Sequence, residues 1–89
     1  MRKVNPLRQL PLTGDYGTIK LHLDEIIKEK NISINQLSFR TEIQRSQIRR
    51  YKDNKIQRVD LDLLARLCYV LECNITDIME FIPPDDNEK

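Results

Sequence analysis

The stretch from Leu61 to Leu71 constrains the fold most strongly, because it is the most apolar helical pattern in the chain. Its apolar side chains recur at helical spacing, so they can bury one face of a helix. This stripe consists of Leu61, Leu64, Leu67, Cys68 and Leu71. Asp60 precedes it and can cap the first turn. In a chain of 89 residues, we expect this helix to form the floor of one small core.

Four other short helices are predicted around this stripe. Together the five helices cover about residues 23–30, 34–40, 45–53, 61–71 and 77–82. Ser33 and Gln36 have the spacing of a capping box at the start of the second helix. Thr76 is the predicted cap of the fifth helix, in which Phe81 and Ile82 would make apolar contacts. The fold class is therefore an all-α, compact five-helix domain.

The ends of the chain have a different character. Residues 1–17 hold both Gly and two of the four Pro, so we expect a flexible N-terminal arm. Residues 18–23 alternate polar and apolar side chains, which indicates a short strand that runs into the first helix. The domain proper is predicted over residues 18–82, and residues 83–89 form a polar tail that begins with two Pro.

Several classes of protein are disfavoured by composition. Cys68 and Cys73 lie five positions apart, so a disulfide between them would close a trivial loop, and we expect buried thiols rather than a zinc site. His22 has no Ser, Cys and carboxylate arrangement around it, and no residue is predicted to be catalytic or to bind a metal or cofactor. No stretch reaches the roughly 20 apolar residues of a membrane span, so we expect a cytoplasmic protein. Because no catalytic arrangement of residues is present in the sequence, we expect that it is not an enzyme.

The net charge of +1 conceals a strong polarity along the chain. Residues 34–58 carry seven basic and two acidic side chains, a local net charge of +5. Residues 59–89 carry two basic and eight acidic side chains, a net charge of −6. A basic cluster of this kind indicates a nucleic-acid partner, although such a run can also be simply a solvated face.

The basic third helix has the pattern expected of a helix that reads the DNA major groove. Ile48 and Tyr51 lie within about 60° of each other around its axis and would anchor it, together with Leu37 and Ile43. The opposite face presents Arg and Ser side chains outward.

The order of these motifs resembles the Cro/repressor-type (Xre-like) helix-turn-helix family, in its small single-domain branch. The resemblance covers about residues 20–80, roughly two-thirds of the chain. It is carried by Leu23-x-x-Ile26-Ile27, Ile32-Ser33, Leu37-Ser38-x-x-Thr41-x-Ile43, Arg45-Ser46-x-Ile48, the run from Val59 to Cys68, Leu71-x-Cys73 and Asp77-Ile78-x-Glu80. Each pattern is weak alone, but together and in this order they are specific.

The resemblance implies a DNA-binding transcriptional regulator, a repressor, that acts as a homodimer on double-stranded DNA. Four residues match base-edge or adjacent phosphate contacts: Arg45, Ser46, Arg49 and Arg50. Four others match DNA backbone contacts: Gln47, Lys52, Lys55 and Arg58. In this branch a strand before the first helix can also pair with one after the fifth, here residues 19–21 with 81–82.

Two positions depart from the family pattern. Glu42 stands in the interhelical turn where Gly is usual, so the turn either holds a left-handed non-Gly residue or has another shape. Gln44 replaces the usual Ser or Thr at the start of the reading helix and is a weaker cap.

One alternative from a different class remains open. The same fold could serve as a protein-binding module, such as the antitoxin of a toxin-antitoxin pair, with the acidic C-terminal third as its contact surface. A small enzyme has no supporting arrangement of residues.

Overall fold

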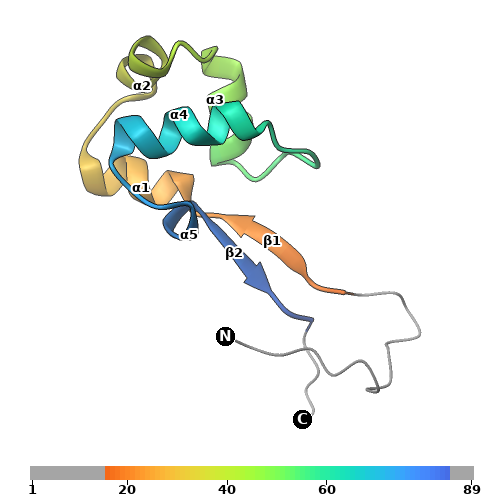
Figure 1. The fold of residues 1–89 in the computed structure, drawn as a ribbon. Helices are drawn as coiled ribbons and strands as arrows, with labels where there is room; N and C mark the ends of the chain where they lie inside the picture. The colour runs from red at the N-terminus through yellow and green to blue at the C-terminus, as the bar shows by residue number, and fades with distance from the viewer. Residues whose placement is uncertain (1–15, 85–89) are drawn as a thin grey trace.

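The computed structural model describes residues 16–84, which form five helices and a two-stranded antiparallel sheet (Figure 1). In chain order the elements are β1 (Thr18–Leu21), α1 (Leu23–Lys30), α2 (Ile34–Thr41), α3 (Arg45–Lys52), α4 (Leu61–Leu71), α5 (Ile75–Ile78) and β2 (Met79–Ile82). The predominantly helical fold confirms the predicted class. Most residues of the predicted arm and tail, 1–15 and 85–89, lie outside the described part of the chain.

The two strands confirm the predicted pairing of the ends of the domain. They run antiparallel, with Ile19 opposite Phe81 and Leu21 opposite Met79. A hydrogen bond of 2.7 Å from the His22 amide to the Ile78 carbonyl extends the pairing into the helical body. The resulting β ribbon projects away from the helices, as Figure 1 shows.

The core is built on α4, as the sequence predicts. For one residue of the apolar stripe, the predicted burial was wrong. Leu61 is 77% exposed, whereas Leu63 is buried. At 100° per residue, Leu61 lies about 120° from the fully buried Leu67 around the helix, while Leu63 lies only about 40° away. Cys68, about 100° from Leu67, is accordingly only half-buried.

The fifth helix differs most from the prediction. Asn74, not Thr76, precedes its first residue, and the Asn74 amide donates a 2.9 Å hydrogen bond to the Asp77 carboxylate. The helix ends at Ile78, because the chain then pairs with β1. Phe81 and Ile82 therefore belong to β2 and are not helical contacts. The third helix is also one residue shorter than predicted and ends at Lys52.

The ends of the other helices follow from local chemistry. The predicted capping box is present, with a 3.0 Å bond from the Gln36 amide to the Ser33 hydroxyl and a 2.9 Å bond from the Ser33 amide to the Gln36 side chain. His22 precedes α1, and its Nε2 lies 2.6 Å from a carboxylate oxygen of Glu80 in β2. This hydrogen bond raises the pKa of His22, and a second carboxylate, that of Glu25, adds to the effect. His22 thus links the start of α1 to the ribbon.

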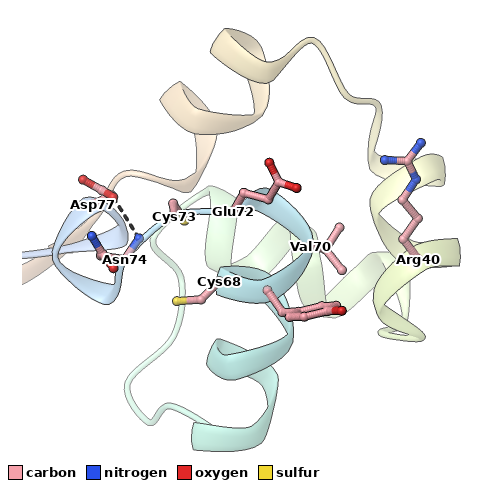
Figure 2. A pocket seen from close by; sticks show the side chains of 8 residues that line it. Arg40, Cys68, Val70, Glu72, Cys73, Asn74 and Asp77 are labelled. Atoms are coloured by element: carbon pink, nitrogen blue, oxygen red, sulfur yellow. Dashed lines mark hydrogen bonds between the residues drawn. The ribbon is translucent and has the colours of Figure 1, made fainter.

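Cys68 and Cys73 are free, half-buried thiols beside a surface hollow at the end of α4 (Figure 2). Burial raises the pKa of the Cys73 thiol, and the neighbouring Cys68 raises it further. Within residues 16–84, no cluster of three or more His, Cys, Asp or Glu side chains could hold a metal ion. None of the helices in that range is long and apolar enough to cross a membrane.

Asn54 joins the end of α3 to the ribbon. Its backbone is left-handed, with φ of 59°, a conformation that Asn tolerates better than most residues. Its side-chain amide pairs with both backbone groups of Leu21, accepting from the N–H at 2.7 Å and donating to the C=O at 3.0 Å. One side chain thereby fixes β1 against the segment that follows α3.

We expect Asn54→Ala to lower the free energy of unfolding by about 2 to 4 kcal/mol, because it removes two hydrogen bonds and leaves the Leu21 backbone groups unpaired. Asn31→Ala is the matched control, since Asn31 is also left-handed, with φ of 55°, and lies at the end of α1. It should lose only about 1 kcal/mol through backbone strain. Urea denaturation measures both values, and equal losses would show that the side-chain pairing contributes nothing.

Candidate nucleic-acid interface

The turn between α2 and α3 is fixed by side-chain hydroxyl groups. The buried Thr41 hydroxyl donates to the Leu37 carbonyl at 2.7 Å and accepts from the Ile43 amide at 3.2 Å. The Ser38 hydroxyl donates to the Ile43 carbonyl. Both backbone groups of Ile43 are therefore satisfied by α2, which sets where α3 begins.

The two departures from the family pattern have clear structural outcomes. Glu42 adopts a left-handed backbone with φ of 61°, so the turn keeps the conformation that Gly would favour. Gln44 makes no side-chain cap to α3, as expected of a weaker cap. The start of α3 is thus held by the hydroxyl contacts of α2 rather than by its own capping residue.

Arg66 on α4 supports the same turn, although no sequence pattern predicts this role. Its guanidinium donates a 3.0 Å hydrogen bond to the Thr41 carbonyl. It also lies 3.9 Å from the Glu42 carboxylate and forms a 3.0 Å ion pair with Asp62 one helical turn away. In the sequence, only the pair with Asp62 is recognisable, as an i,i+4 pattern. The contacts with Glu42 and Thr41 span 24 and 25 positions of sequence.

Helix α3 is anchored as predicted by Ile48 and Tyr51, which are buried together with Leu37 and Ile43. The Tyr51 hydroxyl accepts a 3.0 Å hydrogen bond from the Asp60 amide and so holds the start of α4. With these two side chains inward, the remaining surface of α3 faces solvent. The exposed residues on it are Arg45, Ser46, Gln47, Arg49 and Arg50.

The structure brings the eight predicted DNA contacts onto α3 and the loop that follows it, but two of them already have protein partners. The Arg45 guanidinium donates a 3.0 Å hydrogen bond to the Asn35 side chain. Lys52 is half-buried, 3.0 Å from the Asp53 carboxylate and 3.9 Å from that of Asp24. Within residues 16–84, Arg49 and Arg50 form no ion pair, so their charges are available to a ligand.

The segment between α3 and α4 follows α3 as a loop (Figure 1) and adds basic side chains to this surface. Arg50, Lys55 and Arg58 line one hollow of about 670 Å³ together with Asn54, Ile56 and Gln57. Lys55 and Arg58 are exposed, and neither forms an ion pair with another described residue. Three cations around an open hollow form a surface suited to a polyanion.

Comparison with known proteins identifies the family of the chain. Residues 22–84 match the family profile described as the Cro/C1-type HTH DNA-binding domain. The chain belongs to this helix-turn-helix family. Its helix-turn-helix consists of α2 and α3, with Glu42 in the turn.

Two relatives from Bacillus subtilis (strain 168) agree with this assignment. The "SPbeta prophage-derived uncharacterized HTH-type transcriptional regulator YopS" is 34% identical over 61 residues, which cover 66% of this chain and 80% of YopS. The "Uncharacterized HTH-type transcriptional regulator YozG" is 28% identical over 68 residues, which cover 76% of this chain and 81% of YozG.

A solved structure confirms the fold. The crystal structure of the transcriptional regulator VanUg superposes with a TM-score of 0.62 at 17% sequence identity. The match covers 85% of this chain and the whole of the VanUg chain.

The helix-turn-helix should depend on the Thr41 hydroxyl. We expect Thr41→Val to lower the free energy of unfolding by about 2 kcal/mol, because the buried Ile43 amide loses its acceptor. Thr41→Ser keeps the hydroxyl and removes one methyl group, so it should cost only about 1 kcal/mol or less. Thermal unfolding of both variants compares them, and a Thr41→Ser variant as unstable as Thr41→Val would contradict the role of the hydroxyl.

Proposed function

We propose that this protein is a sequence-specific transcriptional regulator that represses its target by reading the DNA major groove with α3. The observation that carries the proposal is the orientation of α3. Two buried side chains, Ile48 and Tyr51, face the core, and a row of Arg, Ser and Gln side chains faces solvent. The membership in a DNA-binding family supports the same ligand.

The base contacts are assigned to Arg45, Ser46, Arg49 and Arg50. A guanidinium can donate two hydrogen bonds to the major-groove edge of guanine, and a hydroxyl can bond to several bases. Arg49 and Arg50 carry charges without an ion-pair partner among the described residues. Arg45 must exchange its hydrogen bond with Asn35 for one with DNA, so it contributes less net free energy.

The backbone contacts are assigned to Gln47, Lys52, Lys55 and Arg58. Lys55 and Arg58 lie around the hollow beside α3, where a phosphate group would meet the Arg50 charge as well. Lys52 is shared with Asp53 and Asp24, which reduces its attraction for a phosphate. Phosphate contacts position the protein on the duplex but do not distinguish sequences.

Repression requires only that the protein occupies its operator. A protein that binds its operator tightly excludes other proteins from the same stretch of DNA, and this effect requires no further activity. A DNA-binding domain can act in this way, and the structure offers the DNA three cations, Arg50, Lys55 and Arg58, around one hollow beside α3.

Arg49 tests the base readout. We expect Arg49→Ala to weaken binding to the selected operator by about 1 to 3 kcal/mol and to relax the preference at one base pair, because a bidentate contact to a base is lost. The operator is first obtained by selection of bound genomic fragments, and fluorescence anisotropy then measures the affinity. Arg66→Ala is not a suitable control, since Arg66 holds the turn. An Arg49→Ala variant with unchanged affinity and unchanged base preference would contradict the assignment.

Lys55 tests the backbone contacts. We expect Lys55→Ala to weaken binding to operator and scrambled duplexes alike, and to reduce the slope of log affinity against log salt by about one unit. Lys28→Ala on α1 is the matched control, because it removes an exposed Lys whose ion pair is with Asp24 at 3.1 Å. Anisotropy titrations at several salt concentrations give both slopes. If the two variants change the slope equally, Lys55 is not a specific phosphate contact.

A further inference from the structure

We infer that protonation of His22 clamps β2 to the start of α1, and that loss of this proton loosens the strand. The junction between the β ribbon and the helical body then responds to pH near neutrality. The inference rests on the position of one imidazole ring between two carboxylates that belong to different elements. It does not depend on DNA binding.

The His22 ring bridges β2 and α1. Its Nε2 lies 2.6 Å from a carboxylate oxygen of Glu80 in β2, and its Nδ1 lies 3.5 Å from one of Glu25 in α1. An imidazolium has an N–H on both nitrogens and can donate to both carboxylates, whereas a neutral imidazole has only one N–H. Loss of the proton therefore removes one of the two hydrogen bonds and also the charge that strengthens the other.

The other charged side chains of the surrounding elements have different positions or partners. Lys20 of β1 lies opposite Glu80 in the strand register, and its charge acts on Glu25. Asp24 of α1 forms an ion pair with Lys28 at 3.1 Å, and the Asp77 carboxylate of α5 accepts a hydrogen bond from the Asn74 amide. Three charged residues lie in the later part of α1: Lys28, Glu29 and Lys30. Within residues 16–84, the ion pairs of His22 are therefore those with Glu25 and Glu80.

The bridge sets the pH range in which the clamp acts. The hydrogen bond to Glu80 raises the pKa of His22 above its ordinary value of 6.5 and outweighs the partial burial of the ring, which acts in the opposite direction. A raised pKa means that the folded protein binds this proton more tightly than the unfolded chain does. The stabilisation is therefore complete below pH 6.5 and is lost as the pH rises through the raised pKa.

The two strands are attached to the helical body by different contacts. The Leu21 backbone in β1 pairs with the Asn54 side chain at the end of α3, and this contact contains no group that titrates near neutral pH. In contrast, β2 depends on its pairing with β1, on the half-buried Met79 and on His22, whose amide donates to the Ile78 carbonyl at 2.7 Å. A two-stranded ribbon is only marginally stable alone in water. We therefore expect deprotonation of His22 to loosen β2 while β1 stays attached at Leu21.

An NMR titration of the full chain tests the bridge, because His22 is the only His of the sequence and its ring signals can be followed without overlap. We expect a titration midpoint above pH 6.5, and we expect Glu80→Gln to lower it more than Glu25→Gln does, because the contact with Glu80 is the larger cause. Glu29→Gln is the matched control, since it removes the same charge from an exposed position of α1. A midpoint at or below 6.5, or equal shifts in Glu80→Gln and Glu29→Gln, would overturn the inference.

Amide hydrogen exchange tests whether this titration loosens β2. We expect the protection factors of the His22 amide and of the β2 amides that pair with β1 to fall about two- to fivefold as the pH rises through the His22 midpoint. The Leu21 amide is the internal control, because it donates to the Asn54 side chain and should keep its protection. His22→Gln should make the protection of β2 independent of pH.

Two results of the exchange experiment would contradict the clamp. Protection of β2 that does not change through the His22 midpoint would show that the bridge does not hold the strand. An equal loss of protection at Leu21 and in β2 would show that the whole ribbon opens, so that His22 does not act on β2 in particular.

Discussion

The burial of Ile48 and Tyr51 determines both whether α3 forms and which of its faces is exposed. An eight-residue helix is too short to be stable alone, so α3 exists only because these two side chains join the core. Their position also determines the orientation of the opposite face of α3. Once they are inward, the Arg-rich face must be outward, and stability and ligand presentation have the same cause.

Contacts at both ends of α3 add to this constraint. At its start, Thr41 fixes the Ile43 amide and Arg66 holds the Thr41 carbonyl. At its end, the Tyr51 hydroxyl accepts from the Asp60 amide and Asn54 pairs with Leu21. A helix held at both ends loses little further conformational freedom when it binds, so more of its contact free energy appears as affinity. The same contacts connect α3 to α4 and to the ribbon.

The sequence was sufficient for the parts of the fold that depend on local patterns. Helical periodicity identified four of the five helices closely, and the alternation near residue 19 together with the family resemblance predicted the ribbon. The predictions were wrong where two neighbouring residues fit the local sequence pattern almost equally well. Leu61 and Leu63 are both apolar at the start of one helix, and only packing against the core decides which is buried.

Roles that depend on distant contacts could not be predicted in the same way. The role of Asn54 could not be predicted, because its partner Leu21 lies 33 positions earlier. Arg66 has an ordinary i,i+4 pattern with Asp62, yet its important contact is with a backbone carbonyl of another helix. Likewise, the family resemblance implied Lys52 as a DNA backbone contact, and the tertiary structure places it beside two carboxylates.

The charged residues divide the molecule into a basic part and an acidic part. The +5 segment contains α2, α3 and the following loop, whereas the −6 segment contains α4, α5 and β2. A duplex attracts the first and repels the second, so the field favours approach with α3 leading. Glu42 is one of the two acidic residues of the basic segment, and its charge lies beside Arg66, an arginine of the acidic segment. The helix-turn-helix can therefore carry an acidic residue in its turn with less repulsion of phosphate than its position alone would imply, because the compensating cation is supplied by α4.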